Sequence, residues 1–322
     1  MPVVRVIREE MTAAIAVDLG GTNLRAALVD SDATILVHTA TRTPTTGPSG
    51  QVITAAIIAR IEALLETAEG REVAAIGVAS AGPLDLGRGW VTNSPNIAFP
   101  VVEITGPLRE RFGLPVALIN DARAGILGEC WAGAARGSED AVYVTLSTGI
   151  GGGVVANGHL LLGMSGNAGE IGHILVDTRY NLTCGCGYRG HWEGYASAKY
   201  VPRFFAAWRE EVDVRRVAFD ATSTRAIFEA ARAGDPVALA FMDALGQVNA
   251  RGISTIIVAY NPEVIVLDGP LARYYGEIVI GHAEPYIDRF LTLPRIVVSD
   301  LAGRAPLLGA AAYALKRTGA GP

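Results

Sequence analysis

Ala14-Ile-Ala-Val-Asp-Leu-Gly-Gly-Thr-Asn-Leu-Arg-Ala-Ala-Leu28 is an apolar strand, a tight glycine turn and a second apolar strand. Gly20 and Gly21 can adopt backbone angles that other residues avoid, so their N–H groups can approach a phosphate closely. Thr22 adds a hydroxyl, and Asp18 stands where a carboxylate can hold hydrated magnesium beside a nucleotide. A plain hairpin that only turns the chain would have the same pattern, so this stretch needs independent support.

A second copy of the pattern supplies that support. Val144-Thr-Leu-Ser-Thr-Gly-Ile-Gly-Gly-Gly-Val-Val155 repeats the strand, the glycine turn and the strand in the other half of the chain. Two such loops facing each other can hold one nucleotide from both sides, because each offers backbone N–H groups to phosphate. The sequence therefore predicts a nucleotide site to which both halves of the chain contribute.

Composition indicates a compact protein of two domains. The chain has 322 residues, of which 50% are hydrophobic and 18% charged, with a net charge of −5. The 27 Lys and Arg residues are not clustered, which argues against a nucleic-acid partner. Met1–Glu10 lacks the apolar core of a signal peptide, and no apolar run has the length of a membrane helix. We therefore expect a cytoplasmic protein without a membrane partner, and three cysteines do not suggest a disulfide scaffold.

Strands and helices alternate along both halves, and the halves resemble diverged copies of one β-β-β-α-β-α unit. A domain boundary is expected within Asn120–Asp140 because no low-complexity linker is present. The expected strands are 15–17, 26–29, 35–39, 74–79, 116–119, 141–146, 154–162 and 264–267. The expected helices are 52–66, 122–135, 223–233, 236–260 and 307–315, with Asp235-Pro236 as an N-cap and first-turn proline.

Asn120-Asp121 stands at the carboxyl end of an expected strand, where ligands of α/β sheets gather. Phosphoryl transfer to an alcohol needs a carboxylate within reach of the hydroxyl proton, and Asp121 is the candidate for that base. An aspartate at this position also caps helices very commonly. Position alone leaves both interpretations open.

Cys184 and Cys186 form a Cys-x-Cys pair among glycines, with His191 five residues beyond and His173 eleven residues before. Thiolates and imidazoles suit tetrahedral zinc, and four protein ligands make a closed, structural site. A reduced cysteine pair and a strained local disulfide are the alternatives, and the glycines favour zinc. Cys130 is expected to be a buried small hydrophobe.

Three further polar residues are candidates for binding a polyhydroxylated ligand. Glu170 and Glu193 flank the metal segment, and Asn96 offers an amide on a proline-stiffened loop. Carboxylates accept hydroxyl protons at fixed positions. Either glutamate alone would more often be a solvated surface charge, but their neighbourhood of turns and metal ligands favours the binding interpretation.

These residues together resemble the ROK family of sugar kinases and repressors, in the superfamily of actin, hexokinase and the heat-shock chaperone ATPases. The resemblance covers nearly the whole chain. Its motifs stand in family order: Asp18-Leu-Gly-Gly-Thr-Asn-Leu-Arg25, Ser94-Pro-Asn96, Asn120-Asp121-Ala122, Leu146-Ser-Thr-Gly-Ile-Gly-Gly-Gly153, Gly169-Glu-Ile-Gly-His173, Cys184-Gly-Cys186-Gly-Tyr-Arg-Gly190, Ala230-Ala-Arg-Ala-Gly-Asp235 and Gly309-Ala-Ala311.

The resemblance implies an α/β, two-lobed actin-like ATPase (ribonuclease H-like) fold, with two related domains around a central cleft. The small N-terminal lobe would comprise residues 1–122 and 306–322, with the first phosphate loop and the catalytic aspartate. The large C-terminal lobe would comprise residues 123–305, with the second phosphate loop and the zinc segment. A homo-oligomer, either a dimer or a tetramer, is expected from the family.

The resemblance also implies transfer of the γ-phosphoryl group of ATP to the 6-hydroxyl of a hexose, glucose first. ATP, Mg²⁺ and structural Zn²⁺ would be the cofactors, and Asp121 the general base. The sugar would be bound by Gly82, Asn96, Asn120, Asp121, Glu170, His173 and Glu193. The nucleotide would be bound by Asp18, Gly20, Gly21, Thr22, Asn23, Thr148, Gly149, Gly151 and Gly269, and the zinc by His173, Cys184, Cys186 and His191.

The sequence departs from the family pattern at three places. His191 stands where the family usually has a third zinc cysteine, Asp268-Gly269-Pro270 replaces a glycine triplet near the adenosine, and Leu301–Arg304 replaces a Gly-Asp pair. The last two departures leave the donor open among ATP, ADP and polyphosphate. The acceptor is open among glucose, N-acetylmannosamine, N-acetylglucosamine and fructose, because the shape of the pocket around the 2-substituent decides it. A sugar-responsive repressor and an unrelated actin-like ATPase are the alternative classes. About a dozen residues before the first strand are too few for a helix-turn-helix, and such an ATPase would not explain Cys184 and Cys186.

Overall fold

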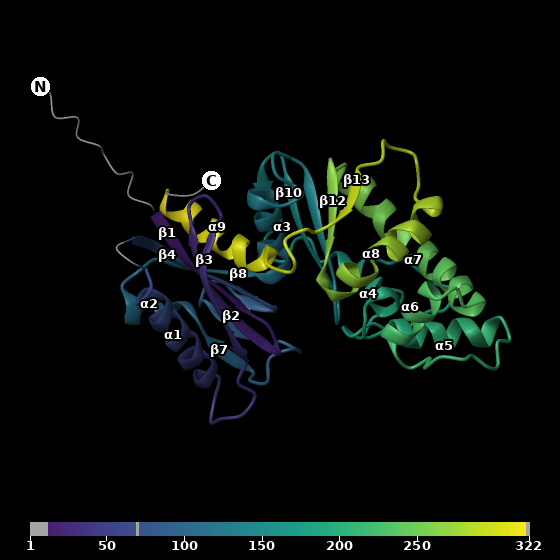
Figure 1. Ribbon diagram of the computed structural model, residues 1–322, viewed down its shortest axis with the longest axis horizontal. Helices are drawn as coiled ribbons and strands as arrows, with labels where there is room; N and C mark the ends of the chain where they lie inside the picture. The colour runs from purple at the N-terminus through teal and green to yellow at the C-terminus, as the bar shows by residue number, and fades with distance from the viewer. Residues whose placement is uncertain (1–11, 69–70, 320–322) are drawn as a thin grey trace, which may run out of the picture. The chain divides into compact units, whose positions relative to one another are not determined.

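The computed structural model describes residues 12–68 and 71–319, and the chain divides into two compact units (Figure 1). The first unit is Met1–Ala132 with Arg304–Pro322, and the second is Gly133–Gly303. The division after Ala132 lies inside the expected range Asn120–Asp140. It falls later than the lobe boundary expected after residue 122, because helix α3 (Asp121–Ala132) packs against helix α9 (Ala305–Thr318) within the first unit. Met1–Glu10, the subject of the signal-peptide expectation, lies outside the described residues.

The first unit is built on a five-stranded sheet with the order β3-β2-β1-β4-β8. Its first three strands form an antiparallel meander, and β4 and β8 then run parallel to β1. The strands are β1 (Thr12–Leu19), β2 (Asn23–Asp30), β3 (Ile35–Arg42), β4 (Glu72–Ser80) and β8 (Val116–Asn120).

The second unit repeats this arrangement in the order β11-β10-β9-β12-β13. Strands β9 to β11 are again antiparallel neighbours, and β12 and β13 run parallel to β9. The two sheets therefore confirm that the halves of the chain are copies of one unit. The strands are β9 (Ala141–Leu146), β10 (Ile150–Ala156), β11 (His159–Leu160), β12 (Val264–Asp268) and β13 (Arg295–Val298).

The expected helices are present, and Asp235 caps the longest of them. Its Oδ1 accepts hydrogen bonds from the N–H groups of Val237 at 2.9 Å and Ala238 at 3.0 Å, as the Asp-Pro pair predicts. The helices besides α3 and α9 are α1 (Gln51–Leu65), α2 (Thr105–Phe112), α4 (Glu193–Ala196), α5 (Val201–Glu211), α6 (Thr224–Arg232), α7 (Pro236–Tyr260), α8 (Gly269–Ala283), and the 3₁₀ turns η1 (Ile171–His173) and η2 (Glu284–Tyr286). A small antiparallel sheet of β5 (Leu84–Asp85), β6 (Trp90–Thr92) and β7 (Val101–Glu103) was not expected.

The expectation of one strand over residues 154–162 was wrong. Asn157 and Gly158 have φ angles of 49° and 72°, so the chain turns back there and β10 pairs with β11 as a hairpin. An Asn-Gly pair between apolar residues is the strongest short hairpin signal, and it outweighs the strand propensity of the residues around it.

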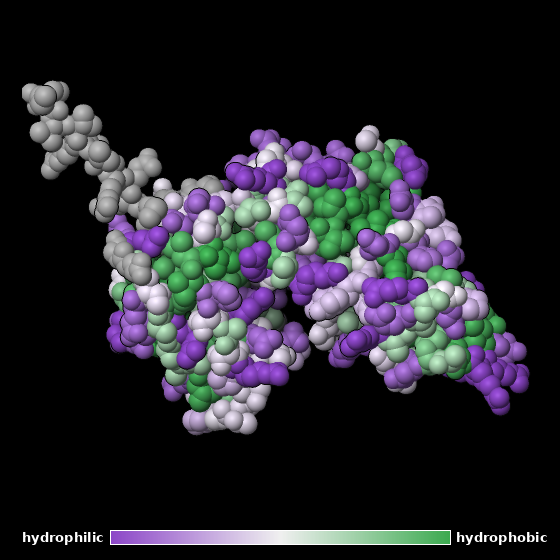
Figure 2. Space-filling model, viewed as in Figure 1, coloured by the Kyte–Doolittle hydropathy of each residue, from purple (hydrophilic) through white to green (hydrophobic). Residues whose placement is uncertain are grey.

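Each unit has its own apolar core. The first is formed by the sheet and α1, with Ile15, Leu28 and Ile57 fully buried. The second contains the aromatic side chains of Phe204 and Phe241, whose rings meet edge to face at 5.3 Å. Figure 2 shows hydrophobic residues at the surface where Figure 1 draws β12 and β13, and three of the four residues of edge strand β13 are only half-buried.

Within residues 12–68 and 71–319, none of the helices combines the length and the apolar character that a membrane span requires.

Helices α3 and α9 approach each other through glycines. A Cβ on Gly309 would overlap the carbonyl oxygen of Ala124, and one on Gly128 would overlap the carbonyl oxygen of Ala305. Both obstacles are backbone atoms, which a rotamer change cannot move aside. This close contact holds the C-terminal helix in the first unit.

We predict that Gly309→Ala lowers the free energy of unfolding by about 1–3 kcal/mol, because the added methyl group must push two helix backbones apart. Urea unfolding followed by circular dichroism measures the change. Gly281→Ala is the matched control, since its Cβ would meet no atom within 4 Å, and it should raise stability by up to about 1 kcal/mol. Equal effects of the two substitutions would contradict the packing account.

Candidate functional site

Parallel pairing brings three strand ends of the first unit to one edge of its sheet. Asp18 lies opposite Ala79 in the register of β1 and β4, and Ser80 lies opposite Asn120 in the register of β4 and β8. The segments that follow these strands therefore leave the sheet side by side. They carry the first glycine turn, Gly82 and Asp121.

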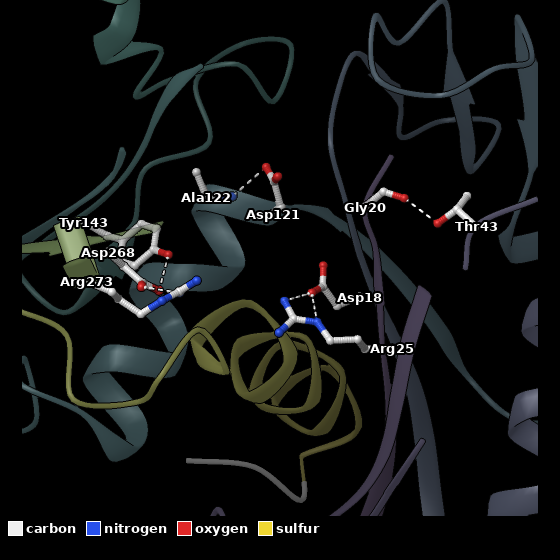
Figure 3. Close-up of polar contacts among 9 residues, drawn as sticks. All are labelled: Asp18, Gly20, Arg25, Thr43, Asp121, Ala122, Tyr143, Asp268 and Arg273. Atoms are coloured by element: carbon white, nitrogen blue, oxygen red, sulfur yellow. Dashed lines mark hydrogen bonds and ion pairs between the residues drawn. The ribbon is translucent and has the colours of Figure 1, made fainter. Parts of the chain in front are cut away.

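The first glycine turn is braced from both sides. The N–H of Gly20 donates to the carbonyl of Asn23 at 3.0 Å, and the hydroxyl of Thr43 donates to the carbonyl of Gly20 at 2.7 Å (Figure 3). Gly21 has no space for a side chain, because a Cβ would overlap the carbonyl of Asn96. The Asn96 loop therefore packs on the turn, while the side chains of Thr22 and Asn23 are exposed.

Asp18, the expected magnesium residue, is buried and paired with Arg25. Its Oδ2 accepts from Nε of Arg25 at 2.9 Å and also from Nη2 (Figure 3). Burial raises the pKa of Asp18, and the guanidinium opposes that rise. Sequence reasoning missed this partner, although the two residues lie directly opposite each other across the β1–β2 hairpin.

Asn120, and not Asp121 alone, caps helix α3. Oδ1 of Asn120 accepts from the N–H groups of Ala122 at 3.0 Å and Arg123 at 3.2 Å. Oδ1 of Asp121 accepts from the N–H of Ala122 at 2.8 Å (Figure 3). The same oxygen accepts from Nδ2 of Asn120 at 3.0 Å. The two side chains thus orient each other at the first turn of α3, with Gly82 beside the amide of Asn120.

The second glycine turn has a carboxylate against its backbone. Oε2 of Glu193 accepts from the N–H of Ile150 at 3.1 Å, and a Cβ on Gly149 would lie 2.5 Å from the same oxygen. Gly269 follows β12 and has a φ of +89°. It lies so close to the end of β9 that a Cβ on it would overlap the carbonyl oxygen of Leu146. Gly269 therefore lies beside the end of β9, where the second glycine turn begins.

Asp268, which precedes Gly269, is almost completely buried and has two partners. Its Oδ2 accepts from the hydroxyl of Tyr143 at 2.9 Å, and its Oδ1 from Nη1 of Arg273 at 2.8 Å (Figure 3).

Arg273 also lines a cavity of about 600 Å³ between α6, α8 and β13. Its walls include the aromatic and cationic side chains of Arg232, Tyr274, Tyr275 and His282. The guanidinium of Arg232 lies over the ring of Tyr275 at 4.7 Å.

The four expected metal ligands lie together in the second unit. One ligand atom from each of His173, Cys184, Cys186 and His191 lies within 4.8 Å of all the others. Nδ1 of His173 is 3.3 Å from Nδ1 of His191 and 3.8 Å from Sγ of Cys184. Sγ of Cys186 is 3.2 Å from Nδ1 of His191. We name this group the His–Cys cluster.

These distances fit a tetrahedral zinc ion. Bonds of about 2.05 Å to nitrogen and 2.3 Å to sulfur give tetrahedral edges of about 3.3 Å between nitrogens and about 3.6 Å between nitrogen and sulfur. Burial raises the pKa of the Cys184 thiol to about 12 and lowers the pKa of His191. The imidazole is then neutral at physiological pH, ready to bind a metal ion, whereas the buried thiol keeps its proton until a cation displaces it.

The other expected residues divide between the two units. Glu170 is exposed at the start of η1, where its carbonyl accepts from the N–H of His173 at 3.1 Å. Cys130, expected to be buried, is half-buried on α3 and lies outside the His–Cys cluster. The first unit brings together Asp18, Gly20–Asn23, Gly82, Asn96, Asn120 and Asp121. The second brings together Thr148–Gly151, Glu170, the His–Cys cluster, Glu193 and Gly269.

We predict that one thiol of metal-free protein reacts fast with a chromogenic disulfide at pH 8, and that zinc blocks it. Cys186 is exposed, whereas burial raises the pKa values of Cys184 and Cys130, to about 12 and about 11, so both stay protonated at this pH. Absorbance time courses with and without zinc measure the rates. Cys130→Ala is the control that leaves the fast phase unchanged, and a fast phase that zinc does not slow would contradict metal binding by the cluster.

Comparison with known proteins places the chain among relatives of the same length. A family model described as "ROK family" matches residues 14–317. A glucokinase from Thermotoga maritima is 37% identical over 319 residues, which cover 95% of this chain and 98% of that protein.

Two solved structures agree with this match. The ROK hexokinase of Thermus thermophilus has a TM-score of 0.81 at 33% identity and covers 96% of this chain and 100% of that one. A ROK family glucokinase from Streptomyces griseus, solved with glucose and AMPPNP, has a TM-score of 0.73 at 33% identity and covers 94% and 99%. These neighbours have the actin-like ATPase fold that the repeated sheets indicate. The chain belongs to the ROK family.

Proposed function

We propose that this protein transfers the γ-phosphoryl group of ATP to the 6-hydroxyl of glucose. The observation that carries the proposal is the match over nearly the full chain to glucokinases, one of which was solved with glucose and a nucleotide analogue. The geometry supports it, because Asp18, Asp121 and Gly269 lie at the ends of strands β1, β8 and β12, where ligands of α/β sheets gather. Each unit contributes part of the set.

Asp121 would act as the general base. Phosphoryl transfer places little covalent demand on the protein, so catalysis rests on holding the hydroxyl near a carboxylate and on neutralising charge. Asn120 restrains the Asp121 carboxylate through its amide at 3.0 Å. Gly82, Asn96 and Asn120 of the first unit and Glu170, His173 and Glu193 of the second would receive the sugar hydroxyls.

The donor would be held mainly by backbone N–H groups. The turns at Gly20–Asn23 and Thr148–Gly151 would hold its phosphates, and Gly269 would lie beside its nucleoside. The cavity along helix α8, the helix that Gly269 begins, offers aromatic and guanidinium planes suited to a base. Mg²⁺ near Asp18 would neutralise phosphate charge, and it would have to compete with the Arg25 guanidinium for that carboxylate.

Zinc on the His–Cys cluster would have a structural role. His173 turns Nδ1 toward the cluster, which leaves Nε2 for a sugar hydroxyl. A ligand held by metal has a fixed tautomer and ring orientation, so Nε2 would be placed in advance of sugar binding. The cluster therefore shapes the proposed sugar site and takes no part in the transfer itself.

The proposal includes the cytoplasm as the place of action and a homo-oligomer, either a dimer or a tetramer, as the assembly. Three free cysteines agree with a reducing compartment in which ATP is abundant. Light scattering during gel filtration measures the assembly directly.

A coupled assay of ADP release, with MgATP and a panel of hexoses and N-acetylhexosamines, tests the proposed function. Glucose is expected to give the highest kcat/KM. A preference for N-acetylmannosamine or N-acetylglucosamine would keep the phosphoryl transfer and replace the acceptor. ADP release that no sugar stimulates would contradict the kinase proposal.

We predict that Asp121→Asn lowers kcat by about 10²–10⁴-fold while glucose still binds, because the amide keeps the shape of the side chain and cannot take the proton. Steady-state kinetics and calorimetric titration with glucose measure the two effects. Asp85→Asn, in the same unit and in an ion pair with Arg88 at 3.8 Å, is the matched control and should leave both unchanged. A near-normal kcat in Asp121→Asn would eliminate this base.

A further inference from the structure

The His–Cys cluster stands on a segment with little regular structure of its own. Between η1 and α4 the described strand pairing is limited to two isolated bridges, Leu175 with His191 and Thr183 with Arg189. Turn and loop hydrogen bonds, such as the one from the N–H of Trp192 to the carbonyl of Ile174 at 2.9 Å, join parts of the segment to one another. The ligand side chains nevertheless lie at tetrahedral distances. Because these backbone bonds have both partners inside the segment, its attachment to helix α7 must come from side chains.

Asp177 is the most deeply buried charge of the segment, with 4% of its side chain exposed. Three groups donate to its carboxylate: the hydroxyl of Tyr195 at 2.9 Å, the N–H of Tyr180 at 2.9 Å and Nη1 of Arg251 at 3.2 Å. An ionised carboxylate is costly to bury unless such donors compensate it. None of the three donors, Tyr195, Tyr180 and Arg251, was given a role in the reaction above.

Two of these donors also bind other points of the segment. The Tyr195 oxygen, fully buried, accepts from the N–H of Leu182 at 2.9 Å. Nη1 of Arg251, on helix α7, also donates to the carbonyl of Val176 at 3.0 Å. One carboxylate thus joins the beginning, the middle and the end of the segment to α7.

The joined points lie on both sides of the metal ligands along the chain. Val176 follows His173 by three residues, and Leu182 precedes Cys184 by two. Tyr195 lies four residues after His191 and shares the short helix α4 with Glu193. A shift at any joined point would move a ligand of the cluster.

A second anchor, independent of Asp177, reaches the same part of α7. Nε1 of Trp192 donates to Oδ1 of Asn249 at 2.8 Å, and both residues are buried. A Cβ on Gly252 would overlap the Trp192 ring, so the indole lies directly on the helix. The segment therefore packs directly on residues 249–252 of α7 through Trp192.

We propose that Asp177 is a positioning residue that sets the geometry of the His–Cys cluster by joining its segment to α7 through Tyr195 and Arg251. It contacts no ligand side chain in the hydrogen bonds described above, and it acts through the backbone that carries them. The consequence for metal binding stands on geometry alone. The consequence for glucose binding rests on the proposed function.

Asp177→Asn tests the proposal, because the amide fits the space but replaces one acceptor oxygen by a donor facing donors. Zinc-loaded protein is mixed with a chromophoric chelator, and the rate of zinc release should rise about tenfold. The visible absorption spectrum of the Co²⁺-substituted protein should change shape. In the sugar assay, the KM for glucose should rise about tenfold, with kcat and the KM for MgATP within about twofold of wild type.

Tyr195→Phe is the second variant, since it keeps the buried ring and removes only the hydroxyl, and it should change the same measurements in the same direction. Asp213→Asn is the matched control, because it removes the same charge from an exposed ion pair with Arg215 in the same unit. Folded Asp177→Asn and Tyr195→Phe proteins that release zinc at the wild-type rate would overturn the proposal, as would a wild-type protein that binds neither Zn²⁺ nor Co²⁺. Faster release in a protein that phosphorylates no sugar would contradict the proposed function and still support the positioning role.

Discussion

Parallel pairing next to the first strand of each sheet is the constraint on which the sites of this protein depend. In the first unit β4 lies between β1 and β8, so three polypeptide segments leave the sheet at the same edge. In the second unit β9 and β12 are paired in the same way. Since a parallel strand fixes the direction of its neighbour, the residues after each strand are brought together by backbone hydrogen bonds alone. The sheet thus fixes where these positions lie, and the side chains that occupy them determine the chemistry of each site.

Three buried carboxylates illustrate how the protein compensates charge near these positions. Asp18, Asp177 and Asp268 each pair with an arginine, and the last two also accept from a tyrosine hydroxyl. A buried ion pair is a poor source of stability, because desolvation offsets most of the attraction, but loss of one partner is strongly destabilising. We infer that these carboxylates serve mainly to hold the neighbouring backbone segments in fixed positions. Two of them stand at strand ends beside a glycine turn, and the third holds the segment that carries the His–Cys cluster.

The sequence was sufficient to predict most strands of the two main sheets and several of the helices, but not the small sheet of β5, β6 and β7. Apolar runs located β1, β4, β8, β9 and β12, since buried parallel strands are nearly continuous in hydrophobic residues. The paired glycine turns predicted the internal repeat. The spacing of Cys184, Cys186 and His191 predicted side chains that do lie together. The strands and the ligand spacing are visible in short stretches of sequence. The internal repeat is visible because the two glycine turns have similar sequences.

Features that depend on tertiary packing were not predicted. Helix α3 from residue 123 on was assigned to the second lobe, and only its contact with α9, about 180 residues later in the chain, shows that it belongs to the first unit. The choice of Nδ1 in both cluster histidines follows from side-chain orientation, which spacing does not encode. Arg251 and Asp177 are far apart in sequence, so no local pattern joins them. The Asn157-Gly158 turn, by contrast, was visible in the sequence and was overlooked.

Phosphorus NMR of the reaction product tests the central claim most directly. The protein is incubated with MgATP and glucose, and the phosphorus spectrum is recorded without proton decoupling. Transfer to the 6-hydroxyl predicts a new phosphomonoester signal split into a triplet by the two protons on that carbon, together with ADP. A doublet from phosphate on the anomeric oxygen, or inorganic phosphate alone, would contradict the account.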